Sequence, residues 1–250
     1  MPADFTRAGY SALLEAFLAR GYAAVGYSDA EPSLRHLIVR HDLDMSIDAA
    51  LPIAEIEAGL GVASSYFVLL RTDMYNPWAE PSRRALRRIA ALGHEIGLHL
   101  DSSLYPDNSD ALEQAASAEC EALEKIVEAA VKTVSFHRPA PGLLGREAPI
   151  AGRQHAYQPR FFSDMGYCSD SRGAWHHGQP LDHQAVTEGR ALQLLTHPIW
   201  WNREAPLDPV ETLDRFRVER DKVLEAALAD NCEPYRAARS NIDSSNQTKR

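Results

Sequence analysis

Short apolar runs in this chain repeatedly end in acidic or imidazole side chains, and one of these ends is crowded with them. The run Leu37-Ile38-Val39 is followed directly by Arg40-His41-Asp42-Leu43-Asp44. Two carboxylates and an imidazole are costly to hold close together at the end of a buried strand unless they bind a cation or share a proton. The cluster therefore predicts a functional site where this strand ends and the next helix begins.

Apolar periodicity and turn residues predict strands that alternate with helices along most of the chain. We expect strands near residues 22–27, 36–40, 64–70, 93–99, 133–136 and 192–195, and helices near 46–58, 81–92, 110–130 and 208–228. A further helix is expected to begin at Thr6 or Ser11 and to end at Ala19. Pro52 would remove a hydrogen bond from the second helix, so that helix is either kinked or begins later than Ser46. Residues 140–158 are rich in Pro, Gly and Ala and predict an extended loop. Alternating strands and helices favour parallel pairing, and a single α/β barrel fits a chain of 250 residues.

Polar side chains follow apolar strand ends at five places along the chain, one of them after the run Tyr167-Cys168-Ser169. They are Asp42 and Asp44, His99 and Asp101, His137 and Arg138, Asp170, and His197. Because parallel strands open their carboxyl ends on one face, these side chains should converge. Taken singly, a histidine at a strand end is more often a structural residue, and an aspartate there is often a helix cap. Five such ends together indicate a site with ligands for a zinc-type metal, a base and an acid.

These residues resemble the polysaccharide deacetylases of carbohydrate esterase family 4, also called the NodB homology domain, from about Leu37 to Trp201. The stretch from Gly93 to His99 is similar to the histidine motif of that family, and Leu194 to Pro198 is similar to its final motif. His41 to Asp44 resembles the aspartate motif of a divergent branch in which an extra residue separates the two acids. Arg138-Pro139, and Asp170 with Trp175, are similar to the two intermediate motifs.

The resemblance implies a distorted (β/α)7 barrel and the metal-dependent removal of an N-acetyl group from a sugar. It assigns the catalytic base to Asp42, metal ligation to Asp44 and His99, and the general acid to His197. It further implies that Arg138 orients the base, and that Asp170 and Trp175 tune and pack the acid. Zinc is the expected metal, with cobalt, nickel and manganese as alternatives.

One departure from the family pattern concerns the metal ligands. The family has a second histidine four residues after the first, and here that position is Ser103, which is a poor ligand. We expect His137, at the end of the adjacent strand, to replace it, with Asp101 and His41 as alternatives. Asp42 and Asp44 also remain open as ligands, because both side chains point the same way in an extended chain.

Aromatic side chains near these motifs suggest where a substrate binds. Trp200 and Trp201 follow the final motif, and Tyr75 lies on a neighbouring loop. These residues and Trp175 are predicted to offer an apolar wall for a sugar or an acetyl group. The alternative is that they are packed residues of the barrel rim.

Composition limits the remaining possibilities. The net charge of −9, from 26 Lys and Arg against 35 Asp and Glu, gives no basic footprint for nucleic acid. Cys120, Cys168 and Cys232 are far apart and are expected to be packing residues. The sequence shows no export signal and no transmembrane span, so we expect a cytoplasmic protein that acts on a nucleotide-linked or lipid-linked sugar precursor of a surface polysaccharide.

We expect one catalytic domain over residues 1–232 and a polar, mobile tail over residues 233–250. Two other functions compete with the sugar deacetylase. One is a C–N hydrolase that acts on a non-sugar amide without metal, which the loss of the second histidine favours. The other is a barrel that binds a glycan without turnover.

Overall fold

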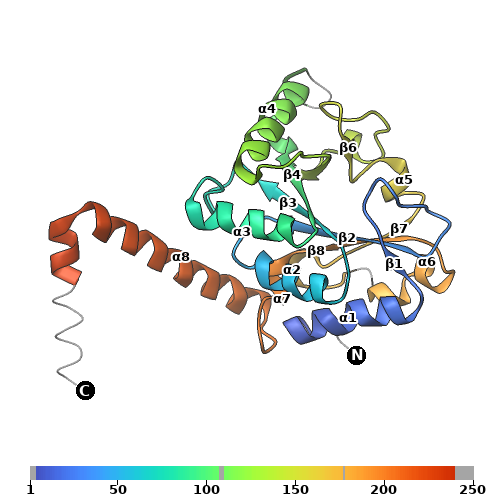
Figure 1. The fold of residues 1–250 in the computed structure, drawn as a ribbon, viewed down its shortest axis with the longest axis horizontal. Helices are drawn as coiled ribbons and strands as arrows, with labels where there is room; N and C mark the ends of the chain where they lie inside the picture. The colour runs from blue at the N-terminus through green and yellow to red at the C-terminus, as the bar shows by residue number, and fades with distance from the viewer. Residues whose placement is uncertain (1–3, 107–109, 177, 240–250) are drawn as a thin grey trace. The chain divides into compact units, whose positions relative to one another are not determined.

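The computed structural model describes residues 4–106, 110–176 and 178–239, which divide into two compact units, Met1–Pro206 and Leu207–Arg250. The first unit is built on a parallel sheet with strand order β6-β5-β4-β3-β2-β8-β7, and β1 pairs with β2 beside this path (Figure 1). The strands are β1 Ala23–Ala24, β2 His36–Leu43, β3 Ser65–Leu69, β4 Glu95–Asp101, β5 Thr133–His137, β6 Gln154–His155, β7 Gly166–Ser169 and β8 Leu192–Thr196.

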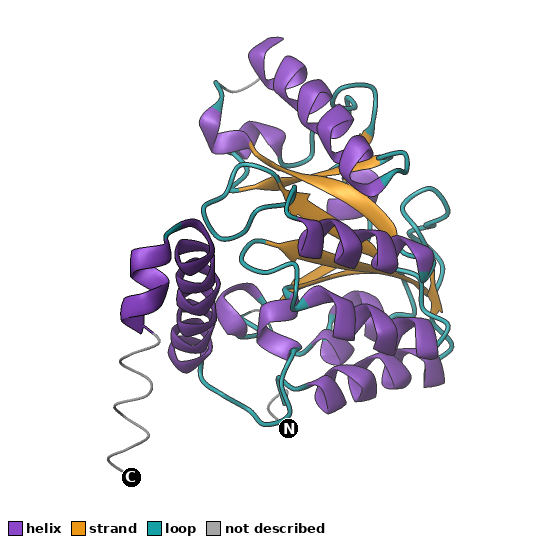
Figure 2. Ribbon diagram, turned by 60° about the vertical axis from the view of Figure 1, so that its left-hand side comes forward, coloured by secondary structure: helices purple, strands orange, loops and turns teal. Residues whose placement is uncertain are grey.

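Helices connect these strands and enclose them, as Figure 2 shows for the first unit. The helices of this unit are α1 Arg7–Ala19, α2 Ala50–Gly59, α3 Glu80–Ala91, α4 Asp110–Val127, α5 Pro159–Phe162, α6 Gln184–Thr187 and α7 Pro198–Trp201. Every strand pair within the described residues is parallel, and the strand path ends at β6 and β7 without closing. The predicted distorted barrel of seven parallel strands is therefore confirmed.

The central strand β2 extends past its predicted end at Arg40. Pairing with the neighbouring strands extends it, because Asp42 lies opposite Phe67 of β3 and His41 lies opposite Thr196 of β8. Asp42 is consequently inside the strand, and Asp44 is the first residue after it. A strand held on both sides places its side chains more rigidly than a loop would.

Two predictions about individual elements need correction or refinement. The helix expected from Ser46 begins at Ala50, and Pro52 lies in its first turn, where a missing N–H removes no helical hydrogen bond. Ser46 instead caps the preceding turn by accepting a hydrogen bond from the amide of Ala49 (3.1 Å). The expected loop over 140–158 contains the short edge strand β6, because its two residues pair with β5.

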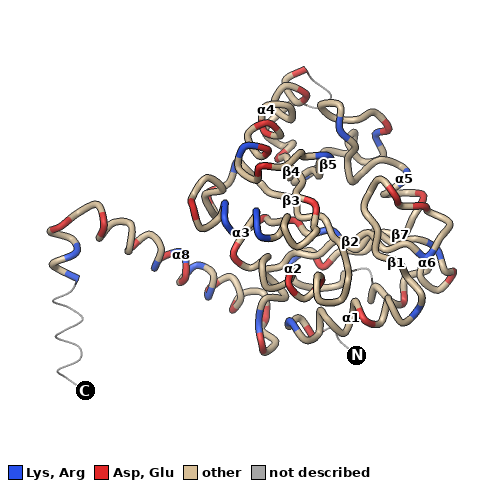
Figure 3. Tube along the Cα trace, in the orientation of Figure 1, with Lys and Arg blue, Asp and Glu red and all other residues tan. Residues whose placement is uncertain are grey.

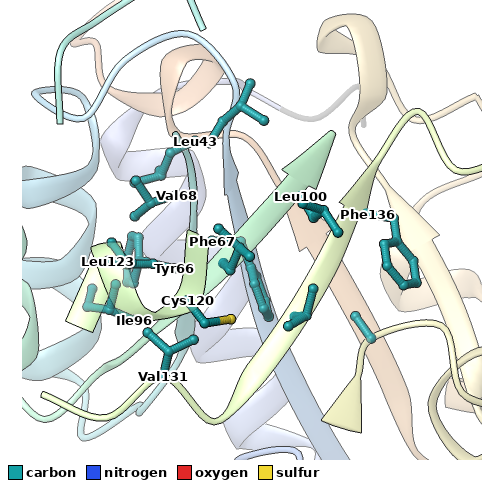
Figure 4. Packing of buried hydrophobic residues seen from close by; sticks show 14 of the residues in the cluster. Leu43, Tyr66, Phe67, Val68, Ile96, Leu100, Cys120, Leu123, Val131 and Phe136 are labelled. Atoms are coloured by element: carbon teal, nitrogen blue, oxygen red, sulfur yellow. The ribbon is translucent and has the colours of Figure 1, made fainter. Parts of the chain in front are cut away.

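The core lies on both faces of the sheet. Ile38 of β2 belongs to one buried cluster and Leu37 and Val39 to another, so this strand is covered on both sides. Figure 4 shows the first cluster, in which β3 and β4 pack with Cys120 and Leu123 of α4. Cys120 and Cys168 are buried as predicted.

The second unit contains α8, Pro209–Asn231, a helix of 23 residues. Asp208 caps it by accepting hydrogen bonds from the amides of Val210 and Glu211, and Pro209 follows the cap. Basic and acidic residues are mixed along its length (Figure 3). Cys232 is exposed, so the packing prediction is wrong for this cysteine.

The predicted limits 1–232 and 233–250 stay predictions, and residues 240–250 of that tail lie outside the described residues. None of the helices within the described ranges combines the length and the apolar character that a bilayer crossing requires. The predicted cytoplasmic location stays a prediction.

Candidate active site

The predicted base, Asp42, is held by an arginine of its own strand. Side chains two residues apart in a strand share a face, so Arg40 and Asp42 lie side by side. Arg40 donates from Nε to Oδ1 (2.9 Å) and from Nη2 to Oδ2 (2.8 Å), and its side chain is fully buried. Burial by itself raises the pKa of Asp42, but the charge of Arg40, aided by His99, outweighs burial, and the pKa is lowered. Asp42 is therefore ionised, and each of its oxygens keeps a second lone pair for another donor.

Asp44 lies at the centre of three imidazoles. Its Oδ1 is 3.0 Å from Nε2 of His99 and 3.4 Å from Nδ1 of His137, while its Oδ2 is 3.7 Å from Nε2 of His197. Burial raises the pKa of Asp44, but His137 and His99 lower it more, so the carboxylate is ionised. The three imidazoles come from the ends of β4, β5 and β8, which brings together residues far apart in the sequence.

The residues Asp44, His99 and His137 fit a divalent metal ion. One ligand atom from each lies within 4.8 Å of the other two. Oδ1 of Asp44 is buried and has no hydrogen-bond partner within the described parts of the chain, although two imidazole nitrogens face it. One carboxylate and two imidazoles are a donor set that zinc accepts, with a coordination position left over.

The other two ligand candidates are engaged elsewhere. His41 points to the opposite face of β2, where its Nε2 lies 2.6 Å from Glu57 and its Nδ1 lies 2.7 Å from the hydroxyl of Thr196. Asp101 accepts hydrogen bonds through Oδ1 from the amide and the hydroxyl of Ser103 (3.1 and 2.6 Å). Asp101 therefore caps the turn that follows β4, and Ser103, at the position of the missing histidine, donates to this cap.

His197, the predicted acid, is held by Asp170. The buried Asp170 lies 2.6 Å from Nδ1 of His197, accepts a hydrogen bond from its backbone amide, and accepts another from Nε1 of Trp201 (2.6 Å). Burial lowers the pKa of His197, but the carboxylate of Asp170 raises it more, to about 9. The imidazole is therefore protonated at neutral pH, and its Nε2 points towards Asp44.

Arg138, predicted to orient the base, lies elsewhere. Among the described residues, the guanidinium that contacts Asp42 belongs to Arg40, whereas Arg138 is exposed at the end of β5 with a positive φ of 50°. Sequence reasoning missed Arg40, although its spacing of two residues from Asp42 in a strand was a usable signal.

Two hollows flank Asp44. A cavity of about 330 Å³ is lined by Asp44 and His137 together with Arg71 and Arg138. On the other side, a recess of about 10 Å³ is lined by Asp42, Asp44 and His197, and a space of this size holds about one water. The larger cavity can admit a small molecule, and the recess can admit the water that would attack it.

The predicted aromatic wall is not part of the larger cavity as formed by the described residues. Trp200 and Trp201 are buried in the core, and Trp175 packs near Trp201 with ring centroids 6.0 Å apart. Tyr75 is buried too, because its hydroxyl donates to the carbonyl of Leu43 (2.6 Å). These positions are those of packed rim residues, the alternative that the sequence left open.

Comparisons with known proteins find only low similarity. No family model matches the chain, and no curated protein matches it. Among solved structures, the chain is similar to the Streptococcus pyogenes deacetylase PplD in complex with acetate, with 12% identity, 83% of this chain and 84% of that chain covered, and a TM-score of 0.42. It is similar to a family 4 carbohydrate esterase from Bacillus anthracis, with 16% identity, 89% and 91% covered, and a TM-score of 0.41.

A third similar structure is BA3943, a CE4 family pseudoenzyme from Bacillus anthracis, with 13% identity, 77% of this chain and 62% of that chain covered, and a TM-score of 0.42. The esterase and the pseudoenzyme belong to the family that the motifs resemble. These similarities are too low to transfer an activity, so the function has to be inferred from the side chains of the site.

Proposed function

We propose that this protein is a metal-dependent hydrolase that removes an N-acyl group, such as acetyl, from an amino sugar. The proposal is carried by the geometry around Oδ1 of Asp44, which the imidazoles of His99 and His137 both face. This oxygen is buried and has no hydrogen-bond partner within the described residues. Asp42 and His197, a candidate base and a candidate acid, line the recess beside it. The proposal also includes two further points. The amino sugar is linked to a nucleotide or a lipid, and the protein acts in the cytoplasm.

Asp44, His99 and His137 would hold the ion, with zinc as the first choice. A bound divalent ion supplies Lewis-acid polarisation of the amide carbonyl and of the attacking water. Asp42 accepts the proton of that water, since Arg40 keeps the carboxylate ionised and fixed in orientation.

His197 completes the reaction by protonating the leaving nitrogen. Its Nε2 carries a proton at neutral pH because Asp170 stabilises the imidazolium. The amide nitrogen of the substrate gains this proton as the C–N bond breaks, so that a free amine leaves. Asp170 also accepts hydrogen bonds from the backbone amide of His197, and its contact with Nδ1 fixes the orientation of the imidazole.

The test combines metal analysis with an acetate-release assay. The purified protein should hold about one zinc, cobalt or nickel ion per chain and release acetate from a nucleotide-linked N-acetylglucosamine. Asp44→Ala and His99→Ala should lose both the ion and the activity. His36→Ala serves as the matched control, because His36 lies at the opposite end of β2. A well-folded protein without affinity for any of these ions, or acetate release that survives exhaustive chelation, would contradict the proposal.

A further inference from the structure

Arg138 does not orient Asp42, the role that the motif resemblance assigned to it. Arg40 contacts both oxygens of Asp42 and donates further hydrogen bonds to the hydroxyls of Ser135 and Tyr157. The base is thus already oriented by a buried guanidinium. The second guanidinium, that of Arg138, makes no ion pair or hydrogen bond with any residue in the described part of the chain.

The backbone fixes the place of Arg138 at the cavity. Arg138 directly follows β5 and adopts a φ of 50°, a conformation that residues other than glycine adopt rarely. Such backbone conformations persist where the surrounding structure enforces them and are frequent at ligand sites. Here the turn sets Arg138 beside His137, and both residues line the larger cavity.

The guanidinium of Arg71 lines the same cavity as that of Arg138. Its Nε pairs with Glu119 at 2.9 Å, and its Cζ lies 5.4 Å from the centre of the Tyr105 ring. These contacts hold the side chain in position, yet 56% of it remains exposed. Two arginines from different strand ends therefore present donors to one hollow beside the candidate metal ligands.

The other residues that line the cavity offer no aromatic platform on which a sugar ring could stack. Its apolar part comes from Met45, Leu69 and Met74, and no Phe, Tyr or Trp of the described residues lines it. A neutral sugar bound by stacking would find no platform here. Three carboxylates and two guanidiniums line the cavity, and Glu119 pairs with one of these guanidiniums. A divalent ion at Asp44 would offset the excess negative charge around the cavity.

We propose that the substrate carries an anionic oxygen group, a phosphate or a carboxylate, that binds Arg138 and Arg71 in the cavity beside Asp44. This inference rests on the proposed amide hydrolysis and narrows its substrate class to an anionic N-acyl amino sugar. Guanidinium groups suit this role because they donate two parallel hydrogen bonds to phosphate or carboxylate oxygens. The N-acyl group would then reach Asp44 and His137, which line the same cavity.

The first experiment measures binding without turnover, so that it stands apart from the test of hydrolysis. Zinc-loaded protein is titrated with the deacylated sugars glucosamine and glucosamine 1-phosphate by isothermal calorimetry. The phosphorylated sugar should bind at least tenfold more tightly. Arg138→Gln, and the double variant with Arg71→Gln, should abolish that preference while zinc content stays unchanged. Arg84→Gln, on the exposed side of α3, is the matched control and should keep the preference.

The second experiment separates the two anion types by acetate release. N-acetylglucosamine 1-phosphate, which carries a phosphate, and N-acetylmuramic acid, which carries a carboxylate, are each compared with neutral N-acetylglucosamine. The anionic substrate with the higher kcat/KM shows which of the two groups the site binds. Equal binding of glucosamine and its phosphate overturns the inference. A phosphate preference that persists in the double arginine variant also overturns it, because the ion alone would then bind the phosphate. Absent acetate release together with an arginine-dependent preference would reject the hydrolase and retain the anion site.

Discussion

Ser135 connects the candidate base to a candidate metal ligand. Its hydroxyl accepts a hydrogen bond from Nη2 of Arg40 and lies 3.0 Å from Nδ1 of His99. A guanidinium only donates, so the hydroxyl oxygen keeps one lone pair and one proton for the imidazole. Metal ligation through Nε2 of His99 requires the ring proton on Nδ1, and Ser135 then accepts it. The serine can thus stabilise the ligand tautomer of His99 by accepting that proton.

We predict that Ser135→Ala weakens zinc binding tenfold to a hundredfold, about 1.4–2.7 kcal/mol, the usual effect of removing the partner of a ligand histidine. The fold should survive, because Arg40 keeps its two contacts with Asp42 and its hydrogen bond to Tyr157 (3.1 Å). Chelator competition on metal-stripped protein gives the affinity, and urea denaturation verifies the fold.

The matched control is Ser169→Ala at the end of β7. That hydroxyl pairs with the hydroxyl of Ser171 (2.6 Å) and contacts none of the candidate ligands within the described residues. Zinc affinity should be unchanged in this variant. If Ser135→Ala also leaves zinc affinity unchanged, Ser135 does not set the tautomer of His99, and the reasoning is refuted.

Three further predictions concern the charges of the site. Arg40→Met should lower the free energy of unfolding by about 3–5 kcal/mol at pH 7, measured in urea, because Asp42 is left buried without its partner. Asp170 raises the pKa of His197 to about 9, against the effect of burial, so this pairing stabilises the fold fully below pH 6.5 and is lost as the pH rises through 9. In metal-free protein, Asp170→Asn should move the NMR titration midpoint of His197 down towards 6.5. Zinc at a hundredfold excess over its Kd should add about 2.7 kcal/mol to the free energy of unfolding, and His137→Ala should remove most of this gain; an equal gain in the variant would exclude His137 as a ligand.

The order of polar residues along the sequence was sufficient to anticipate much of this arrangement. Asp44, His99 and His137 each stand at the end of a predicted strand, and parallel pairing carries such ends to one face. The structure brings these three together because β2, β3, β4 and β5 are consecutive neighbours. No pairwise distance had to be known for that inference, since topology alone implies it.

Other features depended on contacts that no local pattern encodes. The true end of β2 follows from its pairing with β3 and β8, whose partner residues are distant in the chain. Tyr75 is a residue type that often binds sugars, yet its hydroxyl donates a hydrogen bond to the carbonyl of Leu43, 32 positions away in the sequence. Gly97 shows the same dependence on tertiary contacts, because a Cβ there would lie 2.5 Å from the ring of Phe67. Packing of this kind decides orientation only after the sheet has formed.

The partners of the charged cluster support placing the proposed cation at one member of it. On one face of β2, the carboxylate of Asp42 is matched by the buried guanidinium of Arg40. On the other face, His41 is matched by the buried carboxylate of Glu57. Asp44 alone faces only imidazoles, whose charge depends on a proton, and its Oδ1 has no hydrogen-bond partner among the described residues. A divalent ion would supply the missing charge and would leave those imidazole nitrogens free to act as ligands.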